Sequence, residues 1–153
     1  MRSSIVVAAL FLGCVSADVP RPFPYGRAFA DCGPADGPSV RIHLANRPLP
    51  DDLLAAPSRP YLDLVINRSI SEAGGRTYPV DEEGRGASGT SQAQVCAENR
   101  ECVSAGSGRI RLDRAPAGGG ARLEGRYELT MPDGAIVSGR FSATWIEHSP
   151  MCG

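Results

Sequence analysis

Alternating apolar and polar residues are the clearest pattern in this chain. In the segment 39–45, Val40, Ile42 and Leu44 are separated by polar residues, which is the two-residue period of a half-buried strand. Similar patterns predict further strands over 61–66, 76–80, 91–96, 102–105, 122–131 and 137–145. No segment keeps the 3.6-residue period of an amphipathic helix. We therefore expect an all-β fold, a single antiparallel β-sandwich or partly closed barrel of about seven strands.

The C-terminal part of the chain has the strongest strand pattern and predicts a hairpin. Residues 122–131 and 137–145 place apolar side chains on one face and mostly charged or polar ones on the other. A two-residue loop would pair inward with outward positions, whereas a three-residue loop at 132–134 pairs Leu129 with Val137. In this register each of two aromatic rings covers a glycine of the partner strand: Phe141 over Gly125, and Tyr127 over Gly139.

This glycine and aromatic pattern, in Leu123–Leu129 and Val137–Ala143, resembles the closing hairpin of uncharacterised bacterial secreted and lipoprotein β-domains. The resemblance covers the hairpin alone. It implies a β fold and a location in the cell envelope or outside the cell. Because those families have no established activity, the resemblance implies no catalytic residue.

The first residues have the pattern of an export signal. A positive charge at Arg2 precedes the apolar run 5–12, which is too short to span a bilayer as a helix. We assign residues 1–17 to a signal peptide, because the residues up to Ala17 suit cleavage by a general signal peptidase. The mature protein is then secreted or periplasmic.

A second interpretation of the same region is a bacterial lipobox. The sequence 12–14 would then place an acylated Cys14 at the start of an outer-membrane lipoprotein, although Phe11 departs from the usual leucine. No other segment is apolar enough to cross a membrane, so Cys14 is the candidate lipidation site and the only expected anchor. Both interpretations predict export.

Four cysteines remain in the mature chain under either interpretation, and an even number in an oxidising compartment predicts two disulfides. Of the three pairings, we favour Cys96 with Cys102, which would staple a hairpin, and Cys32 with Cys152, which would tie the N-terminal arm to the end of the last strand. A tetrahedral zinc site formed by Cys96, Cys102, His148 and Cys152 is the weaker alternative, because the cysteine spacing is loose and export oxidises thiols. We expect no metal and no cofactor.

Length and composition favour one domain. About 136 residues follow Ala17, enough for a single core. Residues 18–38 are rich in proline and glycine and are expected to form an arm or tether, and residues 39–153 are expected to form the β domain.

Charge is nearly balanced along the chain. The formal net charge is −1, and all basic residues are arginines, interspersed with acidic ones. Because no basic stripe is apparent, nucleic acid is not an expected partner. The expected partner is an unknown molecule of the envelope or the extracellular space.

No constellation of residues points to catalysis. The glycines of 84–89 match a dinucleotide fingerprint by letter, but they follow acidic residues and open no helix. Glu147 and His148 would point to opposite faces of a strand, and His43 is expected at the surface. We therefore assign no catalytic residue.

The expected function is that of a non-catalytic binding or structural module of unknown ligand. Arg100, Tyr61 and Trp145 are the candidate binding surface, with Trp145 as core cover in the alternative. A second hypothesis is a small protease inhibitor that presents Arg100 on the loop between Cys96 and Cys102. A third is an extracellular hydrolase.

Overall fold

The computed structural model describes residues 23–33, 36–81 and 86–152. In these residues nine strands form one sheet, and one short helix, α1 (Ile70–Ala73), precedes β4. The strands are β1 (Tyr25–Cys32), β2 (Pro38–Ala45), β3 (Tyr61–Ile66), β4 (Thr77–Pro79), β5 (Ser91–Cys96), β6 (Cys102–Ser104), β7 (Ser107–Leu112), β8 (Arg122–Thr130) and β9 (Ile136–Ile146). The fold is all-β, as the alternating pattern predicts.

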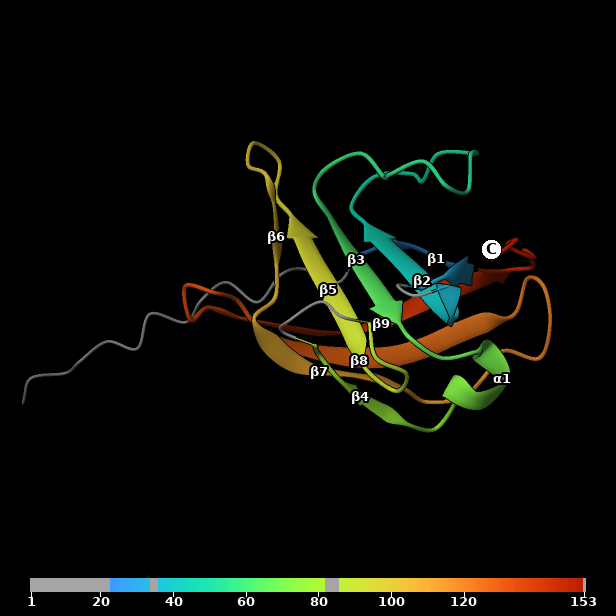
Figure 1. The fold of residues 1–153 in the computed structure, drawn as a ribbon. Helices are drawn as coiled ribbons and strands as arrows, with labels where there is room; N and C mark the ends of the chain where they lie inside the picture. The colour runs from blue at the N-terminus through green and yellow to red at the C-terminus, as the bar shows by residue number, and fades with distance from the viewer. Residues whose placement is uncertain (1–22, 34–35, 82–85, 153) are drawn as a thin grey trace, which may run out of the picture.

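The sheet is curled into a half-barrel (Figure 1). Its strand order is β4-β7-β8-β9-β1-β2-β3-β5-β6, and only β1 and β9 pair in parallel. The half made of β4, β7, β8 and β9 crosses the half made of the other strands, and one core lies between them. Large side chains from both halves are fully buried there: Ile42, Leu44, Leu62, Leu64, Ile110, Leu112, Leu123 and Leu129.

Strand β1 corrects the expected domain boundary. The segment 18–38 was expected to be an arm, yet Tyr25–Cys32 lies in the interior of the sheet between β9 and β2. The prolines of this region lie on either side of the strand and do not interrupt it. The proline content averaged over the whole segment therefore hides a strand of eight residues. Residues 18–22, the proposed signal peptide and Cys14 all lie outside the described residues.

The two hairpins have the expected registers. Leu129 pairs with Val137, and Gly134 in the connecting loop has a φ of 84°, which glycine adopts without strain. In the other hairpin Val95 pairs with Val103, next to the disulfide between Cys96 and Cys102. The short strand β4 lies at one edge of the sheet, as its proline predicts.

Both disulfides have the expected pairing. Cys96 is bonded to Cys102, and Cys32 at the end of β1 is bonded to Cys152 near the C-terminus. Disulfides of this kind indicate an oxidising environment outside the cytoplasm. In the part of the chain that the structure describes, no helix has the length and apolarity needed to cross a membrane.

Candidate functional site

A row of polar side chains crosses β2, β3, β5 and β6 on the face directed away from the core. Cross-strand pairing places His43 beside Asp63 and Asp63 beside Gln94. Gln94 in turn pairs with Ser104, to which its amide donates a hydrogen bond of 3.3 Å. Because successive side chains of a strand alternate between its faces, these residues share one face, opposite the core leucines.

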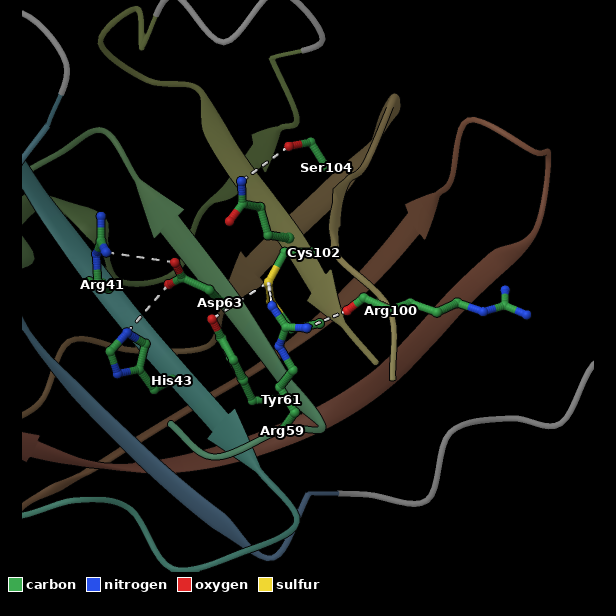
Figure 2. The surroundings of a disulfide bond; sticks show 10 residues. Arg41, His43, Arg59, Tyr61, Asp63, Arg100, Cys102 and Ser104 are labelled. Carbon is green, nitrogen blue, oxygen red and sulfur yellow. Dashed lines mark hydrogen bonds and ion pairs between the residues drawn. A yellow bond between two sulfur atoms is a disulfide. The ribbon is translucent and has the colours of Figure 1, made fainter. Parts of the chain in front are cut away.

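Asp63 is the charged centre of this polar row (Figure 2). One of its oxygens, Oδ2, lies 3.7 Å from Arg41 Nη1, and the other, Oδ1, lies 3.6 Å from His43 Nε2. Arg41 makes a closer ion pair with Asp31, at 2.8 Å. Burial raises the pKa of the Asp63 carboxyl, and the charge of Arg41 opposes that rise. Asp63 is therefore a largely buried acid that shares its guanidinium partner with a second acid.

His43 is buried, although it was expected at the surface. Its side chain has only 4% of its area exposed, because Arg27 from β1 and the loop 46–60 cover this part of the sheet. Arg27 Nε donates a hydrogen bond of 3.3 Å to His43 Nδ1, so that nitrogen acts as an acceptor and the neutral ring carries its proton on Nε2. Burial lowers the pKa of His43 to about 4, and the charges of Arg27 and Arg41 act in the same direction.

Arg27 holds the proline-rich loop 46–60 against the outer face. Its guanidinium donates hydrogen bonds to three backbone carbonyls of that loop, those of Pro50, Asp52 and Ala55, at 2.7, 3.1 and 2.9 Å. The side chain also lies 5.9 Å from the centre of the buried Phe29 ring. Desolvation lowers the pKa of Arg27 without removing its charge near neutral pH. One buried cation thus fixes a loop that has no regular backbone pairing of its own.

A hollow of about 330 Å³ opens beside Asp63. Its wall includes apolar side chains of β3 and β5 and residues that follow β4 and β6. The polar part of its lining combines a guanidinium, two carboxylates, two amides and a hydroxyl: Arg41, Asp63, Asp81, Gln92, Gln94 and Ser104. Most of these groups stand on strands, so the sheet fixes their spacing.

The loop 97–101 projects beyond the sheet at the end of β5 (Figure 1). The side chain of Arg100 points away from the domain (Figure 2). Arg59 braces this loop by donating one hydrogen bond to the Arg100 carbonyl and another, of 3.8 Å, to Cys102 Sγ. Tyr61 donates to the same sulfur at 3.7 Å. The loop is therefore held both by its disulfide and by Arg59 and Tyr61 at the start of β3.

This bracing has a chemical consequence for the inhibitor hypothesis. A serine protease binds the carbonyl oxygen of the bond it attacks in its oxyanion hole. Here Arg59 already occupies the Arg100 carbonyl oxygen. The loop thus carries an exposed arginine side chain whose own carbonyl oxygen accepts a hydrogen bond from Arg59.

The three residues considered for acid–base chemistry, His43, Glu147 and His148, have different surroundings. His43 and His148 both meet the ring of Phe29 edge-on, with ring centroids at 5.4 and 6.3 Å. Glu147 is directed elsewhere, because its Oε1 accepts a hydrogen bond from the Gly119 backbone. The two imidazoles therefore pack around the Phe29 ring, whereas the Glu147 carboxylate binds the Gly119 backbone.

The three candidate surface residues have different environments. Arg100 is exposed, Tyr61 is half-buried beside the short disulfide, and Trp145 has 6% of its area exposed and packs in the core.

The hollow beside Asp63 was not predicted from the sequence. The sequence does show that Arg41, Asp63 and Gln94 lie on the polar faces of three strands. It does not show that these strands are neighbours in the sheet, which only the fold reveals.

Comparisons with protein-family models, with curated proteins and with solved structures give no match to this chain.

Proposed function

We propose that this chain is an exported, non-catalytic binding module that holds a small hydroxyl-rich ligand, of about monosaccharide size, in the hollow beside Asp63. The observation that carries the proposal is the lining of that hollow, where donors and acceptors alternate on neighbouring strands. Sugar hydroxyls both donate and accept hydrogen bonds, so they complement such a lining.

The size and rigidity of the hollow support this proposal. Small-molecule sites have volumes of about 300–1,000 Å³ and a few fixed polar groups, and a volume of about 330 Å³ lies at the lower end of that range. Asp63 is largely buried between Arg41 and His43, and Gln94 is hydrogen-bonded to Ser104. Because these groups are ordered before a ligand arrives, binding has a smaller entropic cost.

Export is part of the same proposal. The disulfides fit an oxidising compartment, and residues 1–17 have the pattern of a signal peptide. Cleavage after Ala17 would release the module, and a lipid on Cys14 would attach it to the outer membrane. Mass spectrometry of the mature N-terminus distinguishes a free Asp18 from an acylated Cys14, and a mature protein that retains residues 1–13 would contradict export.

The binding proposal is tested by NMR titration of the isotope-labelled mature protein with glucose, galactose, mannose and N-acetylglucosamine. We expect at least one sugar to shift the side-chain amide signals of Gln92 and Gln94 in a saturable manner. The variant Gln94→Ala should lose most of the response at Gln92, because it removes a hydrogen-bonding side chain from the lining of the hollow.

A matched control is Asn99→Ala, which removes an exposed amide from the loop 97–101 and leaves the hollow intact. It should bind the same sugar as the unmodified protein does. The proposal is wrong if none of the sugars shifts the signals of the hollow, or if both variants lose binding equally.

A further inference from the structure

A row of three arginines crosses the other half of the sheet. Arg126 on β8 pairs with Arg111 on β7 on one side and with Arg140 on β9 on the other. Residues paired across neighbouring strands have side chains on the same face, and neighbouring strands are about 4.8 Å apart. The three guanidiniums therefore stem from positions that span about 10 Å of the outer face.

Two members of this row, Arg126 and Arg140, have no acidic partner among the described residues. Arg111 lies 3.7 Å from Asp113, and the nearby Arg109 is paired with Glu128 at 3.0 Å. Within the described residues, neither Arg126 nor Arg140 forms an ion pair, and both are exposed. Like charges that face each other across strands destabilise a sheet. The row thus has an energetic cost to folding that a bound anion would relieve.

Two hollows border the arginine row. The one on the side of β7 has a volume of about 400 Å³ and includes Thr77, Arg111 and Arg126 in its lining. The one on the side of β9 has a volume of about 500 Å³ and includes Arg140 and Ser142. The row therefore lies between two depressions whose walls carry cations and hydroxyl groups together with the carboxylates of Asp113, Glu124 and Glu128.

We infer that the outer face of β7, β8 and β9 binds an acidic polysaccharide, with the guanidiniums of Arg111, Arg126 and Arg140 contacting its carboxylate or sulfate groups. A guanidinium binds either group through two parallel hydrogen bonds, and successive charges along one polymer can meet successive arginines. This site is separate from the hollow beside Asp63 and does not depend on the function proposed for it.

The acidic residues on the same face favour a polysaccharide over other polyanions. Glu124 and Glu128 flank Arg126 along β8. These carboxylates would repel the dense charge of a nucleic acid backbone or an anionic bilayer, but they can accept hydrogen bonds from sugar hydroxyls. A polymer with hydroxyl groups between well-separated anionic groups matches this mixed surface.

The test compares the binding of dextran sulfate, polygalacturonate and uncharged dextran to the mature protein by titration calorimetry. We expect one or both acidic polymers to bind, more weakly as ionic strength rises, and uncharged dextran not to bind. The variant Arg126→Glu should weaken the affinity by about ten-fold or more. The same change should raise the melting temperature, since it places a carboxylate between two arginines.

Loss of binding in a variant that is more stable cannot be a consequence of misfolding. A matched control is the double variant Arg47→Ser with Arg100→Ser, which removes two exposed arginines from loops near β5 and β6. It should keep the affinity of the unmodified protein within about two-fold. Phosphatidylglycerol vesicles serve as a fourth probe in the same titration. The inference is overturned if neither acidic polymer binds, if the control loses as much affinity as Arg126→Glu, or if the vesicles alone bind.

Discussion

His43 shows at the residue scale how burial and neighbouring charges act together. Its Nδ1 accepts from Arg27, and its Nε2 faces Asp63. Protonation of Nδ1 would turn a hydrogen-bond acceptor into a donor directed at a guanidinium. Burial is the main reason why the pKa of the ring falls to about 4, well below its ordinary value of 6.5, and the charges of Arg27 and Arg41 add to it.

The lowered pKa of His43 predicts acid-dependent stability. Between about pH 6.5 and pH 4 the unfolded chain binds a proton at this residue and the folded chain does not, so the free energy of unfolding falls as pH falls. The loss should be on the order of 2 kcal/mol. Urea denaturation at a series of pH values measures it, and His43→Gln should remove most of this slope.

Asp63 has the opposite effect on the pH dependence of the free energy of unfolding. Because burial raises the pKa of its carboxyl, the folded chain takes up this proton more readily than the unfolded chain as pH falls, which stabilises the fold in acid. The His43→Gln variant should therefore show a flat or reversed slope over the same interval. A slope that is unchanged in this variant would contradict the structure around Arg27 and His43.

The same residues show what a single sequence can reveal. The alternation in 39–45 places His43 and Arg41 on the face opposite the core, and the structure agrees. It does not reveal that this face is covered. The cover comes from the loop 46–60 and from Arg27, which lies in a segment whose prolines suggested an arm.

At the scale of elements, the glycines of the C-terminal hairpin are fixed by packing. A Cβ atom added to Gly125 would lie 2.3 Å from the Arg111 carbonyl oxygen and 2.6 Å from Phe141 Cζ. Tyr127 covers Gly139 in the same manner, with its hydroxyl 2.7 Å from an added Cβ. These close approaches were predicted from the register alone, because a hairpin is a local structure.

The variant Gly125→Ala should lower the free energy of unfolding by about 2 kcal/mol or more, since neither the backbone of β7 nor the Phe141 ring can move freely. Thermal or urea denaturation measures the change. A matched control is Gly106→Ala, whose added Cβ would lie 3.7 Å from its nearest neighbour. Equal effects of the two substitutions would show that the hairpin register is wrong.

The loop 46–60 depends on Arg27 for its position. Replacing Arg27 with Met leaves the Pro50, Asp52 and Ala55 carbonyls without their donor, so the loop should detach while the sheet persists. Limited proteolysis with thermolysin measures this, because Leu54 in the loop is 65% exposed. We expect cleavage within 50–56 at least ten-fold faster than in the unmodified chain.

Arg122→Met is the matched control for this change. Arg122 also makes several hydrogen bonds, but to Ser142 and Thr144 on the neighbouring strand β9. Its loss should leave cleavage of the loop unchanged. If thermolysin instead cleaves the Arg27→Met variant at sites throughout the chain, this residue supports the entire fold and not the loop alone.

At the scale of the whole molecule, the disulfides differ in what they connect. Cys32 and Cys152 are separated by 120 residues, whereas Cys96 and Cys102 are separated by 6. In the chain-entropy account the long loop contributes about 4–5 kcal/mol and the short one about 2 kcal/mol. The first bond thus stabilises the fold, and the second mainly holds the loop 97–101.

Replacing each pair of cysteines with serines tests this division. The Cys32→Ser and Cys152→Ser double variant should lose about twice as much stability as the Cys96→Ser and Cys102→Ser double variant. Urea denaturation of the two variants under the same conditions makes the comparison. A larger loss from the short loop would contradict the assignment.

The sequence predicts the fold class and both hairpins because these follow from the local alternation of apolar and polar residues. It predicts both disulfides because four cysteines allow only three pairings. It does not predict the order β9-β1-β2, since the parallel pairing of β1 with β9 joins the two ends of the chain. The polar hollow and the arginine row both arise from such non-local neighbours. Candidate sites were therefore the least predictable part of the molecule.

The central claim is that the two halves of the sheet carry separate binding faces. The most direct measurement is one NMR map of the labelled mature protein, recorded with the monosaccharide panel and then with short dextran sulfate oligosaccharides. We predict that a sugar shifts the Gln92 and Gln94 amides, and that the sulfated chain shifts the Arg126 and Arg140 side-chain Nε signals. Absence of both responses, or shifts of one common set of residues by both ligands, would contradict it.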